Sequence, residues 1–210
     1  MTSIDLSRPD RLRLPDAATL VRLFVGGAAG LAVWELWARG LTPLVLGGPL
    51  EPAGLVISLA RRFTGYDLPR LPAEVIHYAI GIIGYPIAYF AVSRWLPRWG
   101  LVLDLAVWAI FTAFALVLVA TGGLTASVSI FWLIVTAVTA TRALNPSSLL
   151  ADCISWGSFT WFNALGIMAP LAGLPFLLME WGGGLSFMSY VGHVIYGFVA
   201  ALVFERLNRA

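Results

Sequence analysis

The sequence predicts an all-α protein, a polytopic bundle of transmembrane helices. Of its 210 residues, 60% are hydrophobic and only 11% are charged, whereas soluble domains carry about 25% charged residues. Several apolar stretches reach the length of about 20 residues that a helix needs to cross the hydrocarbon core of a bilayer. A chain of this length forms one domain, so the surplus apolar surface must face lipid.

The first part of the chain divides into a tail, a span and a loop. Residues 1–16 are polar and predict a short cytoplasmic tail, whereas residues 17–210 are expected to form a single transmembrane domain. In the first span, Gly26 and Gly30 form a GxxxG pattern, which lets another helix pack closely in lipid. A Pro/Gly-rich outer loop at 39–72 follows. Within it, Leu55–Phe63 is too short to cross the bilayer and predicts an interfacial or re-entrant helix.

The remaining apolar stretches bring the expected total to six spans, with four long spans plus short interfacial or re-entrant helices as the alternative. The fifth span carries Pro170 and Pro175 and is expected to kink or to end early. The six expected spans are Ala17–Trp37, Ala73–Trp95, Leu101–Ala120, Ser127–Ala143, Leu149–Leu178 and Leu185–Phe204.

The basic residues predict the compartment and the orientation. All 13 are arginines, which is typical of a GC-rich bacterial genome, so we expect the bacterial cytoplasmic (inner) membrane. If both termini are cytoplasmic, most arginines lie at the cytoplasmic ends of the spans, as the positive-inside rule requires. Only the loop from Arg39 to Arg70 does not follow this rule, because it carries arginines on the outer side. The partner implied is the lipid bilayer, and no basic run with interleaved aromatics indicates a nucleic-acid surface.

Two histidines sit in a repeated H-x-x-x-G pattern. His77 precedes Gly81 and His193 precedes Gly197 by four residues, so each glycine opens a gap on the face of its histidine. Imidazoles on two facing helices suit a haem iron, a chlorin magnesium or another metal. The structural alternative is hydrogen bonding to carbonyls or tyrosines, so the cofactor and the metal stay open.

The same two stretches resemble a known family. His77 to Gly81 lies within Ile76–Gly84, and the second pattern belongs to a G-H-x-x-Y-G helix at Gly192–Gly197, preceded by Gly166–Pro175. This arrangement resembles the YagU-like small multipass proteins of the bacterial inner membrane. The likeness covers a minor part of the chain. It implies a helical membrane protein and no established activity.

The fifth span offers a second line of polar residues. Asp152, Trp156, Asn163 and Pro170 fall on nearly one side of an ideal helix. Asn163 is expected to form an interhelical hydrogen bond, and the face as a whole is a candidate path for a substrate or proton. No complete catalytic set is evident, because Ser158 lacks the second glycine of a nucleophile turn; no catalytic residue is therefore assigned.

These observations favour a membrane protein without enzymatic activity, an accessory or assembly subunit of a larger membrane complex. Other membrane subunits are then its expected partners. The first alternative is a small transporter or channel that uses His77, His193, Asp152 and Asn163. The second alternative is a haem- or pigment-binding membrane component that uses the two histidines.

Overall fold

A computed structural model describes residues 14–95, 101–120, 125–144, 149–181 and 183–209. The described residues are helical with short connections and contain no strand. Three helical stretches are long and apolar enough to cross a membrane: Ala17–Leu46, Arg70–Ala91 and Gly183–Leu207. Six spans are not shown by this set.

The first helical stretch runs further than the sequence predicts. Helix α1 (Ala17–Glu35) continues through the π-helical segment η2 (Leu36–Leu41) into α2 (Thr42–Leu46), and the stretch ends at Gly47, whose φ is +74°. The expected end at Trp37 is therefore wrong. Pro43 does not break the helix, because it follows the π turn and takes an early position in α2, where its missing N–H is not needed. Asp16 caps the start, and hydrogen bonds from Thr19 lower the pKa of its carboxyl.

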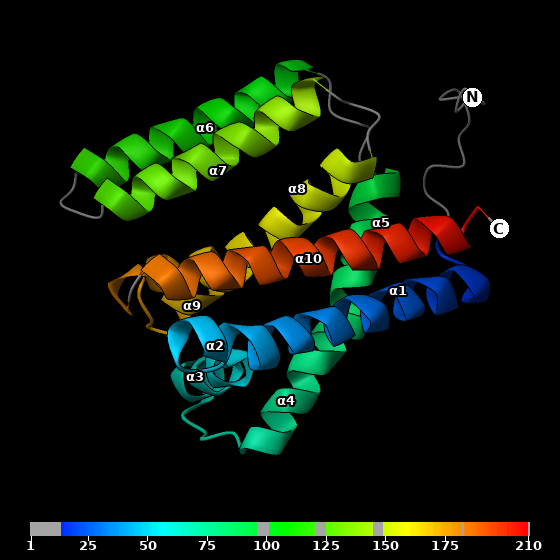
Figure 1. Cartoon of the computed structure of the whole chain (residues 1–210), viewed down its shortest axis with the longest axis horizontal. Coiled ribbons are helices and arrows are strands. Elements are labelled where there is room, and N and C mark those ends of the chain that lie inside the picture. Colours follow the sequence, from blue (N-terminus) through cyan, green and yellow to red (C-terminus); the bar gives the residue numbers. More distant parts are fainter. Residues whose placement is uncertain (1–13, 96–100, 121–124, 145–148, 182, 210) are drawn as a thin grey trace.

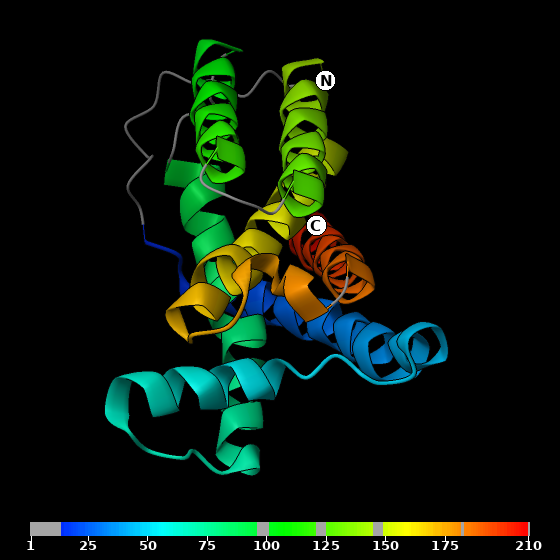
Figure 2. The same cartoon turned by 90° about the vertical axis from the view of Figure 1, so that its left-hand side faces the viewer.

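A short helix and a long rod follow. Helix α3 (Pro52–Thr64) occupies the expected outer loop and ends at Gly65. Helix α4 (Arg70–Ala79), π-helical segment η3 (Ile80–Gly84) and α5 (Tyr85–Trp95) form one rod. The rod crosses α1 and α10, and α3 lies across its α4 end (Figures 1 and 2).

Helices α6 (Leu101–Ala120) and α7 (Thr125–Leu144) pack as an antiparallel pair beside the rest of the bundle (Figure 1). Two reciprocal hydrogen bonds join them. The indole nitrogen of Trp108 in α6 donates to Oγ1 of Thr136 over 2.9 Å, and that of Trp132 in α7 donates to Oγ1 of Thr112 over 2.9 Å. The pair therefore satisfies these polar groups within itself.

The fifth expected span ends early. Helix α8 (Leu149–Trp161) continues through π-helical η4 (Phe162–Met168) into α9 (Ala169–Leu171), after which the chain turns at Gly173. A short 3₁₀ segment, η5 (Phe176–Trp181), leads to the last helix, α10 (Gly183–Leu207).

Glycines allow the closest helix contacts of the bundle. A Cβ added at Gly26 would lie 2.6 Å from the carbonyl oxygen of Ala200, and one at Gly30 would lie 2.9 Å from the Ala200 Cβ. On the opposite face of α10, a Cβ at Gly197 would lie 2.6 Å from the Cα of Gly157 in α8. Helix α10 is thus held between α1 and α8 by glycine contacts, with little room for a side chain.

We expect Gly26→Ala to destabilise the protein by about 1–3 kcal/mol, because its methyl group overlaps the Ala200 carbonyl. Thermal unfolding in detergent measures this loss. Gly84→Ala is the matched control, since a Cβ there meets nothing within 4 Å and alanine is favoured over glycine in a helix by about 0.5–1 kcal/mol. Equal melting temperatures for the two variants would contradict the packing argument.

Candidate functional site

One face of the rod from α4 to α5 carries a stripe of polar groups. The stripe consists of Glu74, His77, the carbonyl of Gly81, Tyr85 and Tyr89, spaced by three or four residues. Steps of four residues drift by about 40° each on an ideal α-helix. The π turn of η3 lies within the stripe and takes up this drift, because a π turn accommodates an extra residue.

The stripe faces the bundle, whereas the opposite side of the rod is apolar and exposed. Glu74 and Tyr89 are only 8% and 5% exposed. Large apolar side chains cover the outer face, namely Val75, Ile76, Ile83 and Ile87. From Glu74 to Tyr89 the stripe extends about 22 Å at the helical rise of 1.5 Å per residue, which is most of a hydrocarbon core of about 30 Å.

At its α4 end, around Glu74, the stripe contacts a cluster of charges from α1 and η2. Arg39 lies between two carboxylates, with its Nε 2.5 Å from Glu35 Oε2 and an Nη 2.6 Å from Glu74 Oε2. Nε2 of His77 lies 3.4 Å from Glu35 Oε1. Arg70 extends the cluster outward, since it lies 2.8 Å from Glu51 Oε2 and 3.7 Å from Glu74 Oε1. We call these residues, Glu35, Arg39, Glu51, Arg70, Glu74 and His77, the charge cluster.

In the middle of the stripe, hydrogen bonds link the rod to α10 and η4. The Tyr196 hydroxyl donates to the carbonyl of Gly81 over 2.7 Å. The amide of Asn163 donates to the Tyr85 hydroxyl over 3.2 Å, and that hydroxyl lies 3.5 Å from the Thr160 carbonyl. Asn163 thus bonds across helices to a residue 78 positions away.

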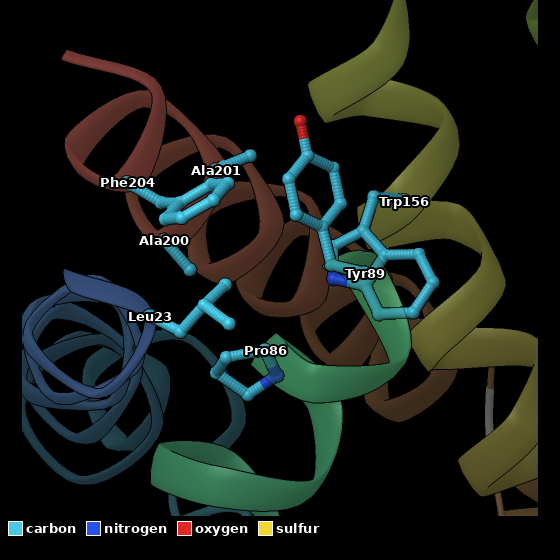
Figure 3. A pocket seen from close by; sticks show the side chains of 7 residues that line it. All are labelled: Leu23, Pro86, Tyr89, Trp156, Ala200, Ala201 and Phe204. Carbon is cyan, nitrogen blue, oxygen red and sulfur yellow. The ribbon is translucent and has the colours of Figure 1, made fainter. Parts of the chain in front are cut away.

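At its other end the stripe reaches the last turns of α10. The Tyr89 hydroxyl donates to Glu205 Oε1 over 3.3 Å, and Glu205 is 8% exposed. Figure 3 shows the ring of Tyr89 between Ala201 and Trp156, beside a pocket large enough for about one water molecule. Apolar groups dominate the lining, which is formed by Leu23, Pro86, Tyr89, Trp156, Ala200, Ala201 and Phe204.

The two histidines have different surroundings. His77 belongs to the charge cluster, whereas Nδ1 of His193 lies 2.8 Å from the carbonyl of Ser189, one turn earlier in α10. The His193 ring also packs edge-on against Trp34, with ring centroids 4.5 Å apart. The imidazoles therefore contact adjacent residues of α1, Trp34 and Glu35. The Tyr196 hydroxyl bonds to the Gly81 carbonyl and the Tyr190 hydroxyl lies 3.2 Å from Ser158 Oγ, whereas the ring of Tyr78 packs against that of His77 with centroids 5.6 Å apart.

The polar line expected along the fifth span does not continue past Asn163. Pro170 is exposed, whereas Trp156 is buried. The reason is η4, because its π turn rotates every later residue relative to an ideal α-helix. Asp152 lies in α8, and its side chain falls outside the described residues.

Sequence reasoning missed the charge cluster, although part of its signal was present. Glu35 and Arg39 are four residues apart, as are Arg70 and Glu74, and such pairs meet on one helix face. The link between these two pairs, from Arg39 to Glu74, spans 35 positions and depends on how η2 packs on α4.

Searches of family models, curated proteins and solved structures found no match to this chain.

We expect Arg39→Gln to destabilise the protein by about 1.5–3 kcal/mol, because it removes a charged hydrogen bond and leaves two carboxylates facing each other. Unfolding at neutral pH in detergent measures this effect. Arg61→Gln is the control, because the pair of Arg61 with Asp67 is largely exposed and such pairs contribute under about 1 kcal/mol. A smaller loss for Arg39→Gln than for Arg61→Gln would contradict this account.

Proposed function

We propose that this chain is a multipass protein of the bacterial cytoplasmic membrane, with six spans and both termini in the cytoplasm. Besides the three long stretches, α6 and α7 have 20 residues each, which matches a core of about 30 Å. The sixth span is the run from α8 to α9. An even number of spans agrees with the contact of Arg22, near the start of α1, with Asn208, just after α10, over 3.3 Å.

Within this topology, we propose that the protein is a small transporter or channel. The observation that carries the proposal is the polar stripe, which extends along the rod while the outer face of the rod stays apolar. Polar and ionisable groups are costly inside a membrane, and where they face the bundle interior they commonly mark pathways for ions or polar solutes.

The helix irregularities support the same proposal. The described residues contain three π-helical segments, and each one holds or adjoins a polar group of the stripe or the charge cluster. Arg39 lies in η2, Gly81 in η3 and Asn163 in η4. Such segments are rare in proteins, well under about 1% of residues, and they occur frequently at functional sites.

The path proposed here differs in part from the one that the sequence suggested. His77 and Asn163 both belong to it, whereas His193 bonds within its own helix and lies beside Trp34. Tyr85, Tyr89, Tyr196 and Glu205 supply the other groups. Protons and small ions are the solutes that fit best, since the pocket at the end of the stripe holds about one water molecule.

Two other functions have less support. The two imidazoles have other neighbours, since Nδ1 of His193 lies 2.8 Å from the Ser189 carbonyl and Nε2 of His77 faces Glu35 at 3.4 Å, which disfavours a haem or pigment held by both histidines. An accessory subunit is favoured by the apolar exposed faces of α6 and α7, including Leu116, Val117 and Leu133, which suit another subunit as well as lipid. The likeness to YagU-like proteins remains part of the proposal and adds no activity.

The six-span topology predicts opposite sides for Thr64 and Asn208, which are both exposed. In vesicles of known orientation, an impermeant maleimide should label Thr64→Cys from outside and Asn208→Cys only from the cytoplasmic face. The native Cys153 is buried and does not compete. With six spans, five lie between these two positions, so they are on opposite sides. With the three long stretches alone, only two lie between them, and both positions would be labelled from the same side. That result would contradict six spans.

The transport proposal predicts that the protein carries protons or small ions in proteoliposomes. With a pH-sensitive dye inside and an imposed pH gradient, the Tyr85→Phe/Asn163→Leu double variant should slow the dye response at least about tenfold, a barrier increase of about 1.4 kcal/mol. Thr136→Val is the matched control, since it removes an interhelical hydrogen bond of α6 and α7, away from the stripe.

Equal rates for the wild type and the double variant would reject the path. A wild-type protein without flux that keeps other subunits bound in mild detergent would instead favour the accessory role.

A further inference from the structure

Three buried polar atoms of the charge cluster have no hydrogen-bond partner. They are Glu35 Oε1, Glu74 Oε1 and His77 Nε2. Glu74 is only 8% exposed. Native proteins leave few buried polar atoms unpaired, and each exception calls for an explanation such as a bound ion. Glu35 Oε1 and His77 Nε2 lie 3.4 Å apart, slightly beyond the usual N–H···O range of about 2.7–3.2 Å, so a small side-chain movement brings them into hydrogen-bond distance.

The charges of the cluster do not balance while His77 is neutral. Three carboxylates, from Glu35, Glu51 and Glu74, meet two guanidinium groups, from Arg39 and Arg70. One negative charge is therefore left over. An uncompensated charge is expensive where water is scarce, and one added positive charge would neutralise the cluster.

A proton fits this requirement better than a metal ion does. The guanidinium of Arg39 already lies between Glu35 Oε2 and Glu74 Oε2, so a metal ion there would meet a positive charge at close range. Among the described residues, no group of three or more His, Cys, Asp or Glu side chains has an arrangement that could hold a metal ion. A proton needs only one lone pair and one acceptor, which His77 and Glu35 provide.

We propose that Glu35 and His77 form a binding site for a single exchangeable proton. A proton from water forms an N–H bond with the unprotonated ring nitrogen of His77, and the resulting imidazolium donates a hydrogen bond to the Glu35 carboxylate. Release of the proton to water breaks that N–H bond and restores the neutral imidazole. No electron is transferred in either direction.

Some groups around the site stabilise the bound proton and others destabilise it, so the proton is exchangeable and not permanent. Burial penalises the imidazolium, whereas the carboxylates of Glu35 and Glu74 stabilise it. The guanidinium of Arg39 acts against it, and His193 in α10 is the other titratable group nearby. Arg70 and Glu51 compensate each other farther out, and Tyr78 lies on the same helix beside Arg39.

The proton site lies at the first end of the polar stripe, beside the exposed end of α4. As the site of a transported or coupling proton it rests on the proposed function. As a proton-binding site it does not, because proton binding is measurable without flux.

Histidine-specific nuclear magnetic resonance provides the test, since the chain has only two histidines. With ¹⁵N-labelled histidine and the full-length protein in phosphatidylcholine nanodiscs, His193→Gln identifies the signals of His77. We expect His77 to change from imidazolium to imidazole as the pH is raised. Glu35→Gln should lower the proton affinity of His77 at least about tenfold, a shift of one pH unit in the midpoint.

Asp67→Asn is the control, because this carboxylate pairs with Arg61 at the surface; it should leave the midpoint of His77 unchanged. A midpoint that also stays unchanged in Glu35→Gln would overturn the proposal. If Glu35→Gln does not fold, the wild-type protein decides, since a His77 that stays neutral throughout the titration overturns it too. An absence of flux with a titrating His77 would reject transport and leave the proton site in place.

Discussion

Hydrocarbon offers no hydrogen bonds, and this constraint governs how the bundle handles its polar groups. Each irregular helix turn frees backbone groups that only the protein can satisfy. At η3, the freed carbonyl of Gly81 receives the hydroxyl of Tyr196 from α10. At η4, Asn163 bonds to Tyr85 of the rod. The polar stripe is thus a means of joining helices as well as a proposed path.

The same constraint explains why small residues stand where helices touch. In lipid, apolar side chains gain little by leaving their surroundings, so close backbone contact and short polar bonds must hold helices together. Gly157 and Gly197 bring α8 and α10 into backbone contact, while Gly26 and Gly30 do so for α1 and α10. Helix α10 is therefore the central element, and the polar partners on its two faces need no long side chains to reach their targets.

The all-helical class was predictable because apolar length is a strong signal in membrane proteins. The bounds of α6 were predicted as Leu101–Ala120 and are confirmed. The extension of the first helix past Trp37 was not, since Pro43 reads as a helix breaker unless a π turn precedes it. Single-sequence patterns give no information on such turns, because they arise from packing against neighbours.

The candidate site was predictable only in fragments. His77, Asn163 and the two glycines after the histidines stood out because polar or small residues are conspicuous in apolar spans. Their partners did not, since the bonds from Arg39 to Glu74 and from Tyr89 to Glu205 join positions 35 and 116 apart. Such pairs depend on how the helices are rotated relative to one another, and a single sequence does not determine that rotation.

The reciprocal tryptophan and threonine bonds between α6 and α7 have a consequence for biosynthesis. In the proposed six-span topology, a hairpin whose indole and hydroxyl groups are satisfied internally can leave the insertion machinery as a unit, before α8 and α10 have been made. The four-helix assembly of α1, the rod, α8 and α10 then forms beside that hairpin. The order in which the helices enter the membrane is thus separate from the order in which they find their neighbours.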